Sequence, residues 1–273
     1  MTSTTSSSTR FATSADGTRI AYETRGSGPA LVFVDGAMCH RAMGPSRDLA
    51  EALAADFTVH SYDRRGRGES GPGSWPYDVT TEVDDLRAVI ESAGGKAHVL
   101  GVSSGGALAL EAARRGVPVD RLAVYEAPFI VDDTRPPNDP NLPAQLQQLV
   151  QQGRRGDAVR TFMRTVGVPA PFIWLMRVMP TWPKMVAIAH TLPYDLSIVV
   201  EHEQGRPLPP GYYEKVAAET LVLAGGKSPA YMRNAQAAIA EAVPGARLEV
   251  VPGQTHMVRA AVLGPLVAGF LRG

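Results

Sequence analysis

The chain has 273 residues, of which 44% are apolar and 20% charged, the composition of an ordinary globular protein. Lysine and arginine together number 27, and aspartate and glutamate also number 27, so the formal net charge is zero. A nucleic-acid-binding protein normally carries a basic excess. The balance of charges argues against that class, and against a membrane-surface protein held by basic residues.

The single cysteine, Cys39, excludes an internal disulfide and argues against a zinc–thiolate site. The six histidines form no His-Glu-x-x-His pattern or comparable cluster, so we expect no metal site. The chain has no run of about 18 apolar residues, and its Ser/Thr-rich start lacks the apolar segment of a secretory signal. We therefore expect a disordered tail over 1–10, no membrane partner, no nucleic-acid partner and a cytoplasmic location.

Short apolar runs alternate with segments of helical periodicity along most of the chain. Residues 11–25 predict two short strands around an Asp16-Gly17 turn, a common sequence for a tight hairpin. Further strands are predicted at 30–34, 57–62, 97–102, 121–125, 220–224 and 247–251, and helices at 45–55, 80–93, 105–115, 229–243 and 259–271. Strands that alternate with helices form a mostly parallel sheet covered on both faces. The predicted fold class is α/β.

The alternation breaks once, between the sixth and seventh predicted strands. Residues 132–216 are rich in proline, predict no strand and contain Trp174 and Trp182. We interpret this segment as a helical insertion into a core domain that consists of 11–131 and 217–273. Its aromatic and methionine side chains favour a hydrophobic substrate, although each of them is also suited to the insertion's own core.

Residues 101–105 read Gly-Val-Ser-Ser-Gly, after an apolar strand and before an Ala/Leu-rich helix. This is the G-x-S-x-G pattern of a nucleophile elbow in the context that the elbow requires. Ser103 takes the nucleophile position, on a strained turn where a side chain at Gly101 or Gly105 would meet backbone. The N–H of Ser104, at a helix N-terminus, is a predicted oxyanion donor. A glycine-rich turn without chemistry is the alternative interpretation.

With this elbow the chain resembles the α/β-hydrolase family, and other motifs agree. Residues 34–38 read Val-Asp-Gly-Ala-Met after the third strand, where the resemblance implies a second oxyanion donor at the N–H of Ala37. Asp35 stands where the family usually has histidine. Residues 63–70 are similar to the family's Asp-x-Arg-Gly-x-Gly-x-Ser turn, which we interpret as scaffold. The resemblance also implies an eight-stranded sheet, with 132–216 as a helical cap between strands six and seven.

A serine hydroxyl is a poor nucleophile until a base takes its proton. His256 follows the last predicted strand, at the family's position for the catalytic base. The carboxylate that orients this base usually follows strand seven, but Ser228 occupies that position and 220–240 contains no Asp or Glu. Glu126, directly after strand six, is the predicted replacement, because strands six and seven are neighbours in this fold.

Other interpretations of the acid stay open. Asp132 and Asp133 lie further along the chain, and a glutamate at a strand end is often only solvated. The arrangement with Glu126 is similar to that of zearalenone-type lactonases, which also have Asp-Gly in the oxyanion loop and a Gly-x-Ser-Ser-Gly elbow. Haloalkane dehalogenases share the glutamate position, but their aspartate nucleophile is excluded by Ser103. The predicted substrate-binding residues are Asp35, Met38, Trp174, Trp182 and His190.

These features predict a serine hydrolase that cleaves a carboxylic ester or lactone of a small hydrophobic substrate through an acyl-enzyme, without a cofactor. A thioesterase or acyl-transfer enzyme with the same triad is an alternative. A non-hydrolytic isomerase and a ligand receptor on the same scaffold are two further alternatives. The sequence predicts neither the substrate itself nor the oligomeric state.

Overall fold

The structure, a computed structural model, describes residues 8–257 and 259–273. In these residues eight strands form one sheet in the order β1-β2-β4-β3-β5-β6-β7-β8. The strands are β1 (Arg10–Thr13), β2 (Arg19–Arg25), β3 (Ala30–Val34), β4 (Thr58–Tyr62), β5 (Ala97–Val102), β6 (Val119–Tyr125), β7 (Glu219–Gly225) and β8 (Arg247–Val251). Only β2 runs antiparallel to its neighbours, so the predicted α/β class and mostly parallel sheet are confirmed.

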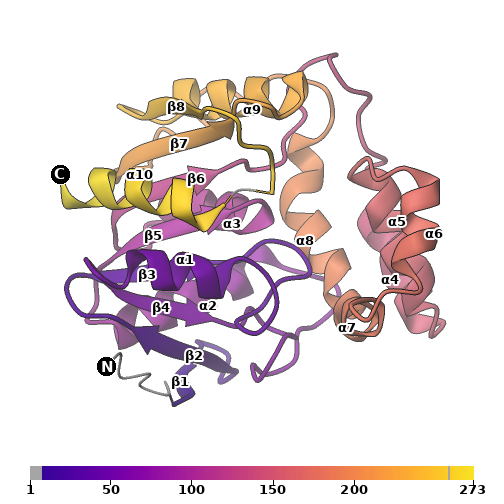
Figure 1. The fold of residues 1–273 in the computed structure, drawn as a ribbon, viewed down its shortest axis with the longest axis horizontal. Helices are drawn as coiled ribbons and strands as arrows, with labels where there is room; N and C mark the ends of the chain where they lie inside the picture. The colour runs from indigo at the N-terminus through magenta and orange to yellow at the C-terminus, as the bar shows by residue number, and fades with distance from the viewer. Residues whose placement is uncertain (1–7, 258) are drawn as a thin grey trace.

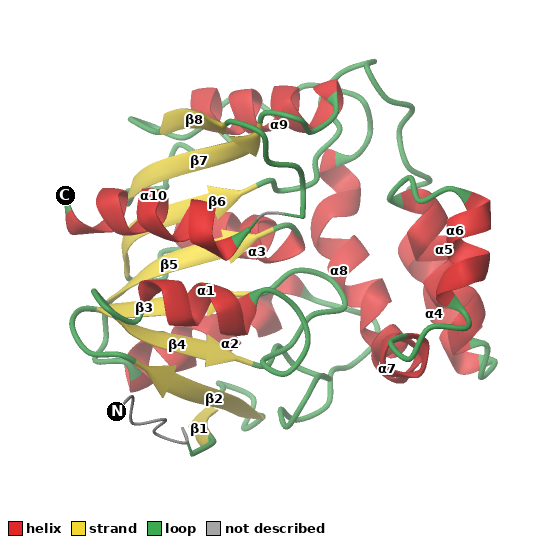
Figure 2. Ribbon diagram, viewed as in Figure 1, coloured by secondary structure: helices red, strands yellow, loops and turns green. Residues whose placement is uncertain are grey.

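In the described part of the chain, five helices cover the two faces of the sheet (Figure 2). They are α1 (Ser46–Leu53), α2 (Val79–Ser92), α3 (Ser104–Arg114), α9 (Ala230–Ala242) and α10 (Ala260–Arg272). The apolar side chains of α1 and α10 belong to one core cluster, and those of α2, α3 and α9 to another. The central strand β5 is buried at all six positions, as expected for a strand that has helices on both faces.

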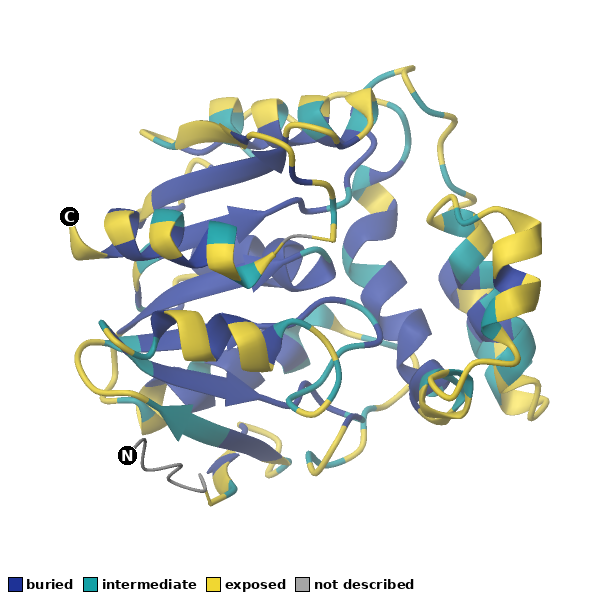
Figure 3. Ribbon diagram, in the orientation of Figure 1, coloured by how far each residue is buried: buried dark blue, intermediate teal, exposed yellow. Residues whose placement is uncertain are grey.

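The segment between β6 and β7 is helical, with α4 (Leu142–Gln151), α5 (Arg155–Thr165), α6 (Ala170–Met176), α7 (Trp182–Ile188), η1 (Ala189–Thr191), α8 (Leu192–Val199) and η2 (Val200–His202). Figure 1 shows this insertion beyond the carboxyl ends of the parallel strands, with α8 between the sheet and α4–α7. α8 is largely buried, whereas most of α6 faces solvent (Figure 3). The insertion therefore joins the core chiefly through α8.

A third apolar cluster connects the insertion to the loop after β3. It contains Met38 from that loop, together with Leu142, Leu146, Ala158, Val159, Phe162, Ile188, Ala189, Leu192 and Leu196 from the insertion. Because Met38 is 6% exposed inside this cluster, the packing of the insertion and the position of the loop depend on each other.

The predicted N-terminal tail agrees only in part with the structure. Residues 1–7 lie outside the described residues, but Arg10 already pairs with Tyr22 in the β1–β2 hairpin. The first strand of the hairpin thus begins at Arg10, one residue before the predicted start, because backbone pairing with Tyr22 includes this polar residue. No helix in the described ranges is long and apolar enough to cross a bilayer.

Candidate active site

Ser103 lies in the sharp turn between β5 and α3. Its backbone has φ 58° and ψ −130°, a strained conformation that a non-glycine residue seldom adopts. The turn is tight, because a Cβ at Gly101 would lie 2.6 Å from the carbonyl oxygen of Gly105, and a Cβ at Gly105 would overlap the carbonyl of Val34. The two glycines therefore permit a turn that presents Ser103 at the carboxyl edge of the sheet.

The imidazole of His256 lies between Ser103 and Glu126. Its Nε2 atom is 3.2 Å from the Oγ of Ser103, and its Nδ1 atom is 2.9 Å from Oε2 of Glu126. The three residues come from the ends of β5, β8 and β6, which the parallel sheet places at one edge. The glutamate is fully buried, while the side chain of His256 is 37% exposed. This arrangement can pass a proton from the hydroxyl to the ring and balance the resulting charge.

Glu126 is held by the end of the neighbouring strand. The N–H of Gly225, at the end of β7, donates to Oε1 of Glu126 at 2.7 Å, and the N–H of Glu126 donates to the carbonyl of Leu223 at 3.1 Å. The residue has φ 49°, a left-handed conformation that is uncommon outside glycine. One carboxylate oxygen is thus fixed by backbone, and the other is directed to the ring of His256.

Ser228 lies after β7, at the position where the family usually has the acid of the triad. It is 1% exposed, and its Oγ has no hydrogen-bond partner in the described ranges. Asp132, the first alternative acid, accepts hydrogen bonds from Thr134 and Asn234 and is partly exposed. Among the carboxylates weighed from the sequence, the one at the ring of His256 is therefore Glu126.

Tyr125 contributes a contact that the sequence did not indicate. Its hydroxyl donates to the carbonyl of Thr255 at 2.7 Å, and its own carbonyl accepts from the N–H of Ser103 at 2.9 Å. Burial raises the pKa of Tyr125 well above its ordinary value, so the phenol stays protonated and donates. One residue thus connects the nucleophile turn with the loop that carries His256. An aromatic residue at a buried strand end reads as core from sequence, so no local pattern marks this contact.

The two predicted oxyanion donors come from the residue after Ser103 and from the residue after Gly36. Among the described residues, neither the N–H of Ala37 nor the N–H of Ser104 donates to a protein acceptor. Gly36 lies directly against the nucleophile, because a Cβ there would be 2.9 Å from the Cβ of Ser103. Two free N–H groups beside a serine hydroxyl are the arrangement that binds the oxyanion of a tetrahedral intermediate.

Asp35, a predicted substrate-binding residue, is directed into the protein, and its contact with substrate stays a prediction. The residue is 1% exposed, and its carboxylate accepts a hydrogen bond from the hydroxyl of Ser46. Burial raises the pKa of Asp35 to about 7, although the Ser46 bond and the charges of Arg67 and Arg64 act in the opposite direction. The structure gives Asp35 a place beneath the loop, because the side chain turns into the protein toward α1.

The predicted substrate-binding residues of the insertion are dispersed. Trp174 is 67% exposed on α6, at the outer edge of the insertion, so the predicted substrate contact has no support from its position. Trp182 is partly buried and packs against the same cluster as Met38. For Trp182 and Met38, contact with substrate stays a prediction.

His190, the last predicted substrate-binding residue, contacts backbone in two segments. Its Nε2 lies 2.8 Å from the carbonyl oxygen of Gly66, and its Nδ1 lies 3.1 Å from that of Ala187. Both ring nitrogens lie near backbone carbonyl groups, and contact of His190 with substrate stays a prediction. His190 instead connects the insertion with the turn after β4.

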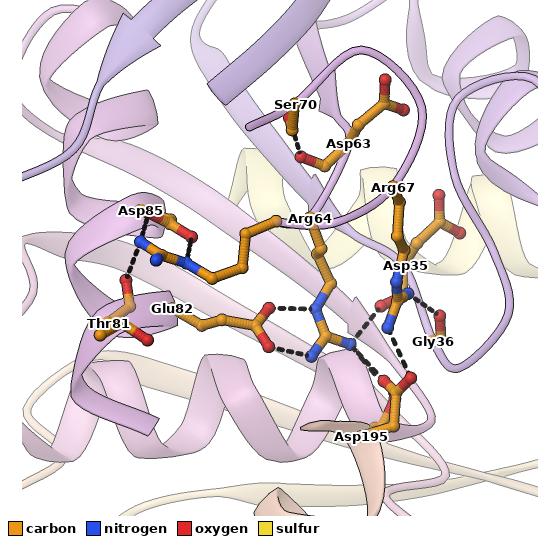
Figure 4. Close-up of polar contacts among 12 residues, drawn as sticks. Asp35, Gly36, Asp63, Arg64, Arg67, Ser70, Thr81, Glu82, Asp85 and Asp195 are labelled. Atoms are coloured by element: carbon orange, nitrogen blue, oxygen red, sulfur yellow. Dashed lines mark hydrogen bonds and ion pairs between the residues drawn. The ribbon is translucent and has the colours of Figure 1, made fainter. Parts of the chain in front are cut away.

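That turn, residues 63–70, carries a buried network of charges that the sequence analysis treated only as scaffold (Figure 4). Arg64 binds Glu82 through two nitrogens, at 2.6 and 2.9 Å, and reaches Asp195 of α8 at 2.8 Å. Arg67 binds the same Asp195 at 2.5 Å. All four side chains are 2% exposed or less. The charges cancel, as a buried cluster requires.

Arg65, in the same turn, forms a separate buried pair with Asp85 of α2, at 2.6 and 2.7 Å. The carboxylate of Asp63 accepts hydrogen bonds from the N–H groups of Arg41 and Glu69. These bonds and the Arg65–Asp85 pair stabilise the turn itself. The scaffold interpretation thus applies to Asp63 and Arg65. No three His, Cys, Asp or Glu side chains in the described part of the chain are grouped as metal ligands.

Comparison with known proteins agrees with this geometry. Residues 31–262 match the model of the Alpha/beta hydrolase family. The chain belongs to this family. It is similar to the crystal structure of an alpha/beta hydrolase from Sphaerobacter thermophilus, with 44% sequence identity, coverage of 96% of this chain and 100% of that chain, and a TM-score of 0.87.

Two other similarities are more limited. An esterase from Exiguobacterium antarcticum has the same fold, with a TM-score of 0.69 and 21% identity over 96% of this chain and 99% of that chain. The uncharacterized hydrolase YraK of Bacillus subtilis is 35% identical over 102 residues, which are 35% of either chain. The match thus spans about a third of YraK, and the esterase supports the fold alone.

Proposed function

We propose that this member of the alpha/beta hydrolase family is a serine hydrolase that cleaves a carboxylic ester or lactone. The observation that carries the proposal is the continuous row Ser103–His256–Glu126, with distances of 3.2 and 2.9 Å, on a strained elbow beside two free N–H groups. A nucleophile, a base and an orienting carboxylate in hydrogen-bond contact are what acyl transfer requires.

In the first half of the reaction, the Oγ of Ser103 attacks the carbonyl carbon while Nε2 of His256 takes its proton. Glu126 stabilises the imidazolium that forms, because its buried carboxylate has no competing side-chain cation within hydrogen-bond reach among the described residues. The N–H groups of Ala37 and Ser104 receive the oxyanion, and each such donor is typically worth about 3 kcal/mol. The imidazolium then protonates the leaving alcohol, and an acyl-enzyme remains.

In the second half, water takes the place of the alcohol. His256 removes a proton from this water, which attacks the acyl carbon, and collapse of the intermediate returns the proton to Ser103. With a lactone, the alcohol stays attached to the acyl group until this step releases the hydroxy acid. The residues present account for every proton, so the proposal requires neither a cofactor nor a metal.

The substrate is proposed to be small and hydrophobic. The third apolar cluster brings Met38 of the oxyanion loop against the insertion helices, so apolar side chains border the loop that receives the carbonyl oxygen. In this proposal residues 132–216 act as a cap that excludes water from the acyl group. Trp182, which is partly buried against the cluster, is proposed to contribute to this cap.

The proposal is tested with purified protein and a panel of aryl esters, thioesters and macrocyclic lactones, each assayed with wild type and with Ser103→Ala. Hydrolysis of an oxygen ester or lactone that disappears in Ser103→Ala is the expected result. Turnover confined to thioesters, or acyl transfer to an added alcohol without hydrolysis, would favour the acyl-transfer alternative. Ligand binding without turnover would favour a receptor, and isomerisation without hydrolysis would favour an isomerase; either result contradicts the proposal.

A further inference from the structure

Asp195 lies at the centre of the contacts between the insertion and the core. It is fully buried in α8, within the segment Leu-Pro-Tyr-Asp-Leu-Ser-Ile-Val, and it is the only charged residue of this helix. Burial would raise the pKa of Asp195, but the charges of Arg67 and Arg64 lower it below its ordinary value, so the carboxylate is ionised. An ionised, solvent-free carboxylate in a short apolar helix is costly unless each of its oxygens is bound.

One oxygen of Asp195 binds the residue after the nucleophile. The hydroxyl of Ser104 donates to Oδ1 of Asp195 at 2.8 Å, and Nη1 of Arg64 donates to the same hydroxyl at 3.3 Å. Ser104 begins α3, and its N–H is one of the two proposed oxyanion donors. Because Asp195 of the insertion holds the side chain of Ser104, the direction of the Ser104 N–H depends on Asp195.

The other oxygen of Asp195 acts through Arg67. Nη2 of Arg67 binds Oδ2 of Asp195 at 2.5 Å, while Nη1 donates to the carbonyl of Gly36 at 2.7 Å and to that of Cys39 at 3.1 Å. The carbonyl of Gly36 and the N–H of Ala37 belong to one planar peptide group, and they point in opposite directions. A guanidinium bound to that carbonyl therefore directs the N–H of Ala37 to the opposite side, and the bond polarises the group.

We infer that Asp195 is a positioning residue for both oxyanion donors: it fixes Ser104 directly and the Gly36–Ala37 peptide through Arg67, so docking of α8 on the core assembles the oxyanion site. The inference rests on the proposed function and deepens it. It also gives the insertion a part in catalysis beyond excluding water, since the same element that covers the site holds the groups that stabilise the intermediate.

The test compares Asp195→Asn with a matched control. Asp85→Asn disrupts the Arg65–Asp85 pair, which is equally buried at 3% and 1% exposure but touches neither Gly36 nor Ser104. Both variants lose a charge from a buried ion pair, so both are expected to lose stability by similar amounts. Only Asp195→Asn is expected to misdirect the oxyanion donors.

For each folded variant, kcat and KM are measured on the ester found active with wild type, together with the affinity for a boronic acid that mimics the tetrahedral intermediate. Asp195→Asn is expected to lower kcat about 10- to 100-fold with little change in KM, somewhat less than removal of a whole donor. The affinity for the boronic acid is expected to fall by a similar factor, because it reports transition-state binding. Asp85→Asn is expected to keep kcat and this affinity.

Ser104→Ala is a second, milder variant that stays informative where Asp195→Asn does not fold. It removes the hydroxyl that Asp195 binds and keeps the backbone N–H, so we expect kcat to fall about 3- to 10-fold, less than for loss of a donor. The inference is overturned, and the proposed function is not, if folded Asp195→Asn or Ser104→Ala keeps the wild-type kcat and the wild-type affinity for the boronic acid. Absence of Ser103-dependent hydrolysis in wild type overturns the proposed function first, and the inference with it.

Discussion

Oε2 of Glu126 lies 2.9 Å from Nδ1 of His256, although 130 residues separate them in the chain. The carboxylate follows β6 and the imidazole follows β8, so the contact passes the end of β7. This is possible because the N–H of Gly225, the last residue of β7, binds the second oxygen of the same carboxylate at 2.7 Å. The end of β7 therefore supplies a backbone anchor in place of an acidic side chain.

The role of Glu126 is tested by Glu126→Gln. A glutamine has nearly the same volume, but its neutral side chain neither stabilises the imidazolium nor fixes the ring tautomer. We expect kcat to fall by about 10³- to 10⁴-fold, as when the acid of a serine triad is made neutral. Steady-state kinetics measures this loss, and thermal unfolding shows whether the fold is intact. Glu126→Asp, which keeps the charge on a shorter side chain, is expected to retain more activity; near-wild-type turnover in Glu126→Gln contradicts the assignment.

Ser228→Ala is expected to leave turnover within about twofold of wild type. The hydroxyl is buried and has no partner in the described ranges, so its removal deletes no hydrogen bond and relieves an unsatisfied polar group. The same reasoning predicts an unchanged or slightly higher unfolding temperature. Kinetics and thermal unfolding are measured side by side with the Glu126 variants. A loss comparable to that of Ser103→Ala would mean that the end of β7 takes part in the chemistry.

Glu203→Gln is expected to change the pH dependence of stability. Burial raises the pKa of Glu203 to about 7 from 4.5, against the opposing effects of Asn138 and Arg135. The folded state therefore keeps a proton that the unfolded state releases between about pH 4.5 and 7, so this group's contribution to stability falls as pH rises through that window. The variant lacks this decline.

Urea unfolding of both proteins at about pH 4.5, 6 and 8 measures the effect. The difference in unfolding free energy, variant minus wild type, is expected to increase with pH by about 1.4 kcal/mol for each unit of pKa separation, and to level off above pH 7. Asp35, which titrates in the same window, is present in both proteins and cancels in the difference. A difference that is flat across the range, or that decreases, contradicts the account of Glu203.

Cys39 is expected to be inert in the native protein. Burial raises the pKa of its thiol to about 12, and the negative charge of Asp35 adds to this effect, so little thiolate is present at pH 8. Alkylation requires the thiolate. Iodoacetamide should therefore leave both mass and turnover of the folded protein unchanged, and should modify one thiol in urea. Rapid alkylation of the folded protein would show that the oxyanion loop opens.

Ser103 was predicted from a local motif, and Glu126 from its place at the end of the strand beside strand seven. His256 was predicted from the resemblance to the α/β-hydrolase family, and the structure brings these three side chains into hydrogen-bond contact. Arg64, Arg67 and Asp195 were not recognised as a unit. Their contacts join residues 131 and 128 positions apart, and no periodicity marks an aspartate in an apolar helix as the partner of two arginines in a turn.

The insertion was predicted as helical, but the direction of its side chains was not. Trp174 and Trp182 both looked suited to a pocket, yet Trp174 faces solvent and Trp182 packs within the insertion. A tryptophan's exposure depends on how α6 and α7 pack, and helices of seven residues have too few turns to show an apolar face. Tertiary packing, which local sequence does not encode, decides these positions.

The most direct measurement of the central claim is intact-protein and peptide mass spectrometry after reaction with a fluorophosphonate. A serine activated by His256 and Glu126 attacks the phosphorus and keeps the label. We predict one adduct per chain on the peptide that contains Ser103, none in Ser103→Ala, and much slower labelling in Glu126→Gln. A wild-type protein that stays unlabelled, or a label that persists in Ser103→Ala, would contradict the account.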